Sequence, residues 1–156
     1  MVVITVPFVG AAEELAATIR AAVVGRIVVD VTNPARPDYS GLLFDGSSSA
    51  AEQFASWLPE ARVVKAFNTV FAANQANPVV DGTRLDAFVA GDDEGAKAVV
   101  LDLARSAGFE PIDAGDLTAA RLLEALAWLN ISLNLRNPYG WRTGWKLVGV
   151  PVAVAA

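Results

Sequence analysis

The sequence alternates short β-branched runs with longer stretches whose apolar residues recur at helical spacing. Strands are expected at residues 2–6, 26–31, 62–66, 85–90 and 109–113. Helices are expected at about 11–24, 47–58, 94–107 and 117–135, and segment 67–83 is expected to mix loop with short helix. Strands that alternate with helices in this way favour a parallel sheet. We therefore expect an α/β fold built on about five strands, with flanking helices and a long C-terminal helix.

The length, composition and net charge of the chain limit the kinds of protein that it can be. The 156 residues, 54% of them hydrophobic and 19% charged, predict one compact domain over 1–156. A net charge of -5 argues against binding to nucleic acid or to an anionic membrane. The first residues carry no basic segment, and the apolar run 148–156 is too short to span a bilayer, so we expect a cytoplasmic protein.

The residue types that are absent exclude several kinds of chemistry. The chain has no cysteine and no histidine, so disulfides, thiolate catalysis, a histidine base and the usual zinc sites are excluded, and no metal site is expected. Acid–base chemistry would have to come from Asp, Glu, Lys, Tyr or ordered water.

No phosphate-binding loop can be found in the sequence. The pattern G-x-G-x-x-G, which lets a pyrophosphate approach the backbone at a helix N-terminus, does not occur. Without three charge-assisted hydrogen bonds of such a loop, binding would be weaker by about 4–9 kcal/mol. We therefore expect this chain alone to hold a dinucleotide poorly, although an apolar pocket at the strand ends would remain.

Several short segments, taken in order, resemble the family of NADPH-dependent deazaflavin reductases. They are Thr5–Phe8, Val29–Pro34, Val63–Thr69, Phe88–Asp93, Asp113–Leu117, Ala120–Glu124 and Trp145–Leu147. The resemblance implies a truncated Rossmann-like sheet, because the family begins with about three further strands and two helices that carry the glycine-rich loop. It also implies NADP as cofactor, and it makes residues 2–6 the counterpart of the family's fourth strand.

With no strand before it, the segment Val2–Val6 would form an open edge of the sheet. This edge is short and apolar, and it has no charge or proline to block pairing. We expect it to be covered by a second copy, giving a homodimer, or by a partner chain.

Three residues are candidates for catalysis: Lys65, Asn68 and Glu124. Lys65 ends a predicted strand, where burial would lower its pKa and let it polarise a carbonyl or act as a base. The alternative is a surface ion pair. Glu124 lies three residues after Arg121 on the last helix, so an intrahelical salt bridge is the competing interpretation. Asp30 is expected to pair structurally.

Further candidates fall into two groups. The candidates for cofactor binding follow the strands, where ligands of open α/β sheets bind: Pro7, Phe8, Asn33, Pro34, Thr69 and Val70. The resemblance implies that Pro7 and Phe8 flank the nicotinamide and that Asn68 and Val70 contact the deazaflavin. The candidates for a substrate pocket come from the last helix and the tail: Arg121, Trp128, Asn130, Tyr139, Trp141 and Trp145. Alternatively, the aromatic residues close the core, and Asn130 and Asn134 form hydrogen bonds across a dimer.

Three functions remain open at this point. The first is an oxidoreductase that uses NADP and a deazaflavin. The second is a cyclase or isomerase of a biosynthetic pathway, which would bind a small hydrophobic, flat-ring ligand in the former cofactor pocket without any cofactor. The third is a noncatalytic dimeric binding module.

Overall fold

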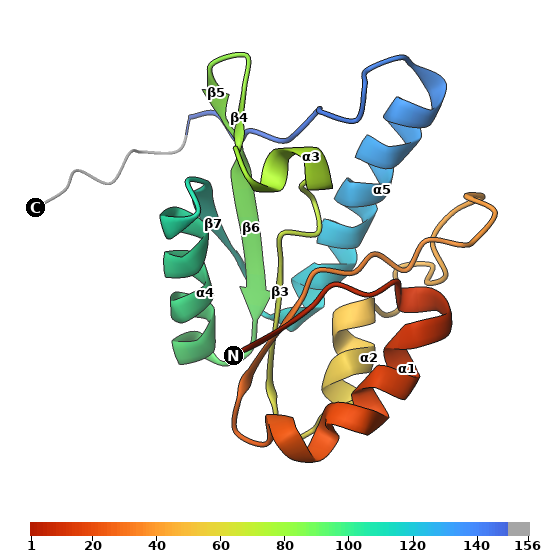
Figure 1. Cartoon of the computed structure of the whole chain (residues 1–156), viewed down its shortest axis with the longest axis vertical. Coiled ribbons are helices and arrows are strands. Elements are labelled where there is room, and N and C mark those ends of the chain that lie inside the picture. The colour runs from red at the N-terminus through yellow and green to blue at the C-terminus, as the bar shows by residue number, and fades with distance from the viewer. Residues whose placement is uncertain (150–156) are drawn as a thin grey trace, which may run out of the picture.

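The computed structural model describes residues 1–149 (Figure 1). Residues 150–156, which the predictions of a single domain and an apolar tail include, lie outside the described residues. The main sheet has five strands in the order β1-β2-β3-β6-β7. Their bounds are Val2–Ile4, Ile27–Asp30, Arg62–Ala66, Asp86–Gly91 and Glu110–Gly115.

The expected α/β fold is confirmed, and most of the sheet is parallel. Strands β1, β2 and β3 run in one direction, and β7 is parallel to β6. The pair β3–β6 is antiparallel, which the sequence did not predict. The connection holds the short helix α3 (Ala72–Gln75) and the hairpin β4 (Val79–Val80) and β5 (Thr83–Arg84), but no helix that crosses back over the sheet. A parallel strand needs such a crossover, so β6 returns in the opposite direction.

Helices cover both faces of the sheet (Figure 1). Helix α4 lies on one face, and α1 and α2 lie on the other. Helix α5 begins beside α2 and extends beyond the strands. These helices span Phe8–Ile19 (α1), Ala50–Trp57 (α2), Glu94–Ser106 (α4) and Ala120–Arg136 (α5). In α1 the regular helix begins at Ala11, as predicted, because Val9 and Gly10 have non-helical backbone angles. Two short 3₁₀ helices, Arg20–Val23 and Leu117–Ala119, complete the set.

Local sequence explains where two of these helices begin. The Ser49 side chain accepts a hydrogen bond from the Glu52 backbone N–H at 3.1 Å and so caps the start of α2. The Asp93 carboxylate accepts from the Ala96 N–H at 2.7 Å and starts α4 in the same way.

Hydrophobic cores lie on both faces of the sheet. The core under α1 and α2 includes Ile4, Val28 and Phe54, and the core under α4 includes Val29 and Val64. Every residue of β2 is buried, because this strand is covered on both faces.

The β1 strand forms one edge of the sheet, as expected. It spans three residues rather than the predicted five, and the Val2 and Val3 side chains are 36% and 46% exposed. Among residues 1–149, no helix is long and apolar enough to cross a membrane.

Candidate functional site

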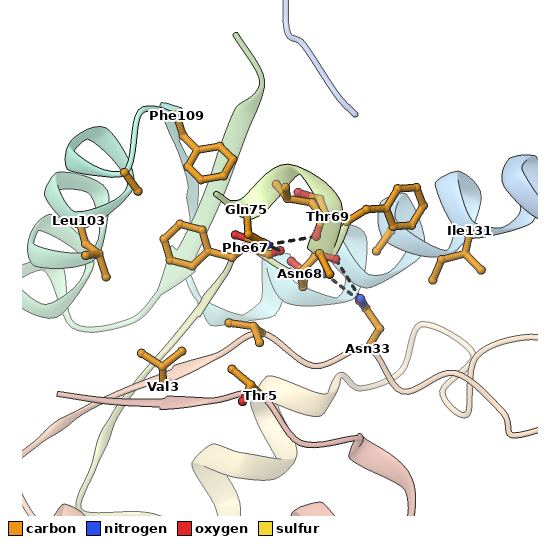
Figure 2. Close-up of a pocket in the computed structure, with 16 residues that line it drawn as sticks. Val3, Thr5, Asn33, Phe67, Asn68, Thr69, Gln75, Leu103, Phe109 and Ile131 are labelled. Atoms are coloured by element: carbon orange, nitrogen blue, oxygen red, sulfur yellow. Dashed lines mark hydrogen bonds between the residues drawn. The ribbon is translucent and has the colours of Figure 1, made fainter. Parts of the chain in front are cut away.

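A cavity of about 570 Å³ opens at the carboxyl ends of β1, β2 and β3 (Figure 2). Its walls are mostly apolar, with aromatic rings from Phe67, Phe71 and Phe109. The polar side chains in its lining are Thr5, Asn33, Asn68, Thr69 and Gln75. Its position matches the general rule that open α/β sheets bind ligands where the strands end.

The pleat of the strands brings these side chains to one face. Val3 and Thr5 are two residues apart, as are Val31 and Asn33, so each pair points to the same side of the sheet. Helix α4 contributes Leu103 to the wall, Ala107 follows directly after α4, and α5 contributes Ala127 and Ile131. The cavity therefore lies between the carboxyl ends of β1 and β2 on one side and helices α4 and α5 on the other.

Two asparagines are linked at the floor of the cavity (Figure 2). Asn33 Nδ2 donates to the Asn68 backbone oxygen at 2.9 Å, and Asn68 Nδ2 donates to Asn33 Oδ1 at 3.0 Å. Asn68 Nδ2 also donates to the Leu123 oxygen of α5 at 3.1 Å. This amide pair joins the ends of β2 and β3 to α5 and fixes both side chains.

Unpaired polar atoms and a strained backbone mark the segment after β3. Asn68 Oδ1 and Thr69 Oγ1 are buried and have no hydrogen-bond partner among residues 1–149. Phe67 has φ 62, in the left-handed region, which typically costs a non-glycine residue about 1–3 kcal/mol. The Gln75 side chain holds this turn by donating to the Phe67 and Val70 oxygens. Such strain is often found at binding sites, where it holds side chains toward a ligand.

A buried triad of charges lies beneath the amide pair. Lys65 Nζ contacts Asp30 Oδ2 and Glu124 Oε1, each at 2.8 Å, and donates to the Thr32 oxygen at 2.6 Å. All three side chains are at most 2% exposed. The ammonium group therefore uses its whole donor capacity, and none of the three residues is part of the cavity lining.

The surroundings of Glu124 in this triad shift the pKa of its carboxyl group. Burial raises the pKa of the Glu124 carboxyl above its ordinary value of 4.5, and the Asp30 carboxylate adds to the rise. Lys65 and the Ala50 N–H, which donates to Glu124 at 2.9 Å, oppose it. Because the triad has two carboxylates and one ammonium group, it carries a net negative charge when both acids are ionised.

The triad holds the backbone that positions the amide pair. Asp30 Oδ1 accepts from the Thr32 N–H at 2.8 Å, and Lys65 binds the Thr32 oxygen, so Thr32 is held on both sides directly before Asn33. Glu124 is adjacent to Leu123, whose oxygen binds Asn68. Lys65 and Glu124 therefore influence the cavity only through the residues they hold in place, because neither side chain lines it.

Replacing Glu124 with glutamine is expected to change how stability depends on pH. A carboxyl whose pKa is higher in the folded state binds more protons when folded, so the free energy of unfolding falls as pH rises above about 4.5. In Glu124→Gln, the decrease of the free energy of unfolding between about pH 4.5 and the raised pKa of Glu124 should be absent. Urea unfolding at a series of pH values measures this free energy.

Glu52→Gln is the matched control. Arg121 lowers the pKa of the Glu52 carboxyl, mainly through its hydrogen bond, so this group adds stability above about 4.5 that is lost as pH falls. Glu52→Gln should leave in place the decline of the free energy of unfolding that begins above about pH 4.5. A Glu124→Gln profile that overlays the wild type would contradict the assignment.

Comparison with known proteins identifies relatives across most of the chain. No family model matches it. It is 38% identical over 120 residues to the F420-dependent NADP reductase of Methanocaldococcus jannaschii, which covers 72% of this chain. The corresponding protein of Methanothermobacter thermautotrophicus is 35% identical over 146 residues, or 88% of this chain. A solved structure of a putative F420-dependent NADP reductase from Arthrobacter sp. FB24 superposes with a TM-score of 0.79 at 34% identity over 85% of this chain.

The chain resembles the F420-dependent NADP reductases in sequence and in fold. It spans 52% and 61% of the two archaeal reductases, and 62% of the Arthrobacter chain. A second group of relatives includes Metalloreductase STEAP3 of Rattus norvegicus, 43% identical over 103 residues, of which this chain covers 20%.

Four of the predicted residues meet at the cavity. Asn33, Asn68, Thr69 and Val70 all line it. Pro7 and Phe8 lie beside it, where α1 begins, and line a neighbouring hollow. Pro34 contributes its backbone oxygen, which accepts from the Leu43 N–H at 2.8 Å.

The charged candidates do not meet at the cavity. Lys65 forms a fully buried ion pair, so the alternative of a surface pair was wrong. The predicted salt bridge between Arg121 and Glu124 is also wrong: Glu124 pairs with Lys65, and Arg121 binds Glu52 across to α2. Asp30 pairs structurally, as expected. The proposal that Lys65 and Glu124 act directly on a substrate has no support from their burial.

The predicted substrate pocket does not form as one group. Its members Arg121, Trp128, Asn130, Tyr139, Trp141 and Trp145 are all outside the cavity lining. Asn130 and Asn134 find partners within the chain, because both bind Thr143 and hold the segment after α5. Trp141 packs edge-on against Phe71, which is itself one of the residues that line the cavity.

Several lining residues were missed by sequence reasoning. Val3, Phe67, Phe109, Ala127 and Ile131 have ordinary apolar side chains, which give no signal of a cavity on their own. Alternation along the strand could have found Val3 and Thr5, since both share a face. The contributions of α4 and α5 depend on how the helices pack, which the sequence pattern does not specify.

Proposed function

We propose that the chain forms the ring-binding part of an oxidoreductase that transfers a hydride between NADP and a deazaflavin. The observation that carries the proposal is the cavity of about 570 Å³ at the carboxyl ends of β1–β3. Small-molecule sites typically occupy about 300–1,000 Å³ and combine apolar walls with few polar groups. Relatives named F420-dependent NADP reductase support the same chemistry, since F420 is a deazaflavin.

The residues at the cavity fit a flat heteroaromatic ring. Phe67, Phe71 and Phe109 offer aromatic walls, and planar rings pack well against such faces. Asn68 Oδ1 can accept a hydrogen bond, and the Thr69 hydroxyl can donate or accept one, and neither has a partner within the described chain. A ring that carries amide and carbonyl groups would satisfy both atoms.

The chain's own residues would bind and orient the ring rather than react with it. When bound, a reduced nicotinamide supplies the hydride. Asn33, Asn68 and Thr69 would hold the ring, and the apolar walls would exclude water from it. Lys65 and Glu124 are positioning residues in this scheme, because they hold Thr32 and the α5 backbone.

We also propose that another strand pairs with β1 and helps to hold the nucleotide phosphates. Val3 belongs both to the open edge and to the cavity lining, so a strand added there would lie beside the ligand. That strand would come from a second copy or from a partner chain.

We expect the reaction to take place in the cytoplasm.

A blocked cavity tests the proposed ligand. Ala107 is exposed and lines the cavity from the end of α4, so Ala107→Trp should fill its mouth at little cost to the fold. The affinity for F420 and for reduced nicotinamide mononucleotide, measured by isothermal titration calorimetry, should fall at least about tenfold. The mononucleotide avoids the need for an adenosine site.

Ala98→Trp serves as the control, because Ala98 is exposed on the opposite side of α4. It should bind both probes like the wild type. Equal affinity in the two variants, or no binding of either probe to the wild type, would refute the proposed site.

A further inference from the structure

A second hollow, of about 690 Å³, lies where the start of α1, the loop before α2 and the end of α2 meet. These two helices lie side by side (Figure 1). Its lining comes from residues 8–14, 17, 43, 44, 53 and 57, and we call it the α1–α2 hollow. Among the described residues, none lines both this hollow and the cavity at the strand ends. The proposed binding of a ring at the strand ends therefore leaves the α1–α2 hollow without a role.

Three aromatic rings form one side of the α1–α2 hollow. Phe8 and Trp57 are stacked, with ring centroids 5.9 Å apart and an interplanar angle of 18°, and Phe44 meets Phe8 edge-on at 5.8 Å. All three side chains are half-buried, so part of each ring stays accessible. The buried Phe54 packs edge-on against both Phe8 and Trp57. The core thus holds the stacked pair in place before any ligand arrives, which lowers the cost of binding.

The charge of the α1–α2 hollow is negative. Glu13 and Glu14 are exposed and line it. Among residues 1–149, neither carboxylate forms a salt bridge, and no lysine or arginine lines the hollow. The start of a helix carries about half a positive charge, so the two carboxylates leave the hollow with about -1.5. It therefore favours a cation.

We propose that the α1–α2 hollow binds a small organic ammonium ion that carries alkyl groups on its nitrogen. Aromatic faces attract such cations, and their alkyl groups pack against the rings without a hydration shell to lose. The carboxylates add Coulomb attraction at the rim. A metal ion would need several oxygen ligands, and within the described chain no three acidic side chains lie close enough to hold one. The volume lies within the range of about 300–1,000 Å³ that is usual for small-molecule sites.

Choline and its neutral counterpart 3,3-dimethylbutan-1-ol test the proposal, because the two differ only by carbon in place of the charged nitrogen. Titration of the full chain, followed by NMR chemical shifts and by tryptophan fluorescence, gives both dissociation constants. Choline should bind at least about tenfold more tightly than the alcohol. Equal affinities, or no saturable binding of choline, would overturn the proposal.

The carboxylates are tested by the double variant Glu13→Gln/Glu14→Gln, whose exposed positions leave the fold intact. It should weaken choline binding about tenfold and leave the binding of the alcohol unchanged. Asp81→Asn/Glu110→Gln is the matched control, because it removes the same charge at two exposed positions outside the hollow. It should bind choline like the wild type. Equal losses in the two double variants would assign the attraction to the net charge of the chain and refute the site.

The aromatic side is tested at Trp57. Trp57→Leu keeps an apolar side chain but removes the ring face, so it should weaken choline binding several-fold, whereas Trp57→Phe should restore most of it. Thermal unfolding shows whether both variants fold, and the carboxylate variants decide if Trp57→Leu does not. Equal choline binding by folded Trp57→Leu and wild type would contradict the aromatic contact. The affinity for F420 should be the same in Glu13→Gln/Glu14→Gln as in the wild type, since the two sites share no residue.

Discussion

Replacing Lys65 with methionine is expected to lower the free energy of unfolding by about 3–5 kcal/mol at neutral pH. The substitution keeps the length of the side chain but leaves Asp30 and Glu124 facing each other without a counter-ion in a fully buried site. One of the two acids must then take up a proton for the chain to fold. The loss should consequently be smaller at pH 5 than at pH 8. Chemical denaturation at both pH values measures the difference.

Lys97→Met provides the matched comparison. The Lys97 side chain is only 5% exposed, but its partners Glu94 and Asp113 are 80% and 47% exposed, so they remain hydrated without it. This variant should lose no more than about 1 kcal/mol. Adding Asp30→Asn and Glu124→Gln to Lys65→Met should restore most of the stability. Equal losses for Lys65→Met and Lys97→Met would mean that the buried triad carries no uncompensated charge.

Replacing Phe109 with alanine is expected to cost about 3–5 kcal/mol and to weaken ligand binding as well. Phe109 is 1% exposed, packs against Phe67 with ring centroids 5.8 Å apart, and lines the cavity (Figure 2). Its removal takes away core contacts and also one aromatic wall. Thermal unfolding measures the first effect, and calorimetric titration with F420 measures the second.

Phe54→Ala separates the two effects. Phe54 is fully buried on the other face of the sheet, where it packs against Phe8 and Trp57. Its removal should destabilise the protein to a similar extent but leave the ligand affinity of the folded fraction unchanged. If Phe109→Ala bound F420 as tightly as Phe54→Ala does, the aromatic wall would have no part in binding.

The elements of this fold could be predicted from the sequence better than their arrangement could. Residues 62–66 form β3 with the predicted bounds, and α2 lies within the predicted range 47–58, because β-branched runs and helix caps act locally. The β4–β5 hairpin was missed, since each strand has only two residues. The reversal of β6 depends on the path of the connection, which carries no local signal.

The same distinction applies to the site. Asn33, Asn68 and Thr69 follow strands directly, so the general rule for strand ends was enough to select them. Lys65 and Glu124 are 59 residues apart, and their pairing depends on how α5 packs over β3. Helical spacing suggested Arg121 as the partner of Glu124, but burial placed the carboxylate inside and left the arginine at the surface.

The reversed strand β6 also determines where three acidic side chains lie. Because β6 and β7 run opposite to β3, the acidic turns that follow them open at the far end of the sheet, beside Arg62 at the start of β3. Asp92, Asp93 and Asp116 therefore stand a full strand length from the cavity. In an all-parallel sheet these carboxylates would surround its mouth and repel a phosphorylated ligand. One inverted connection thus places these three carboxylates at the end of the sheet opposite the cavity.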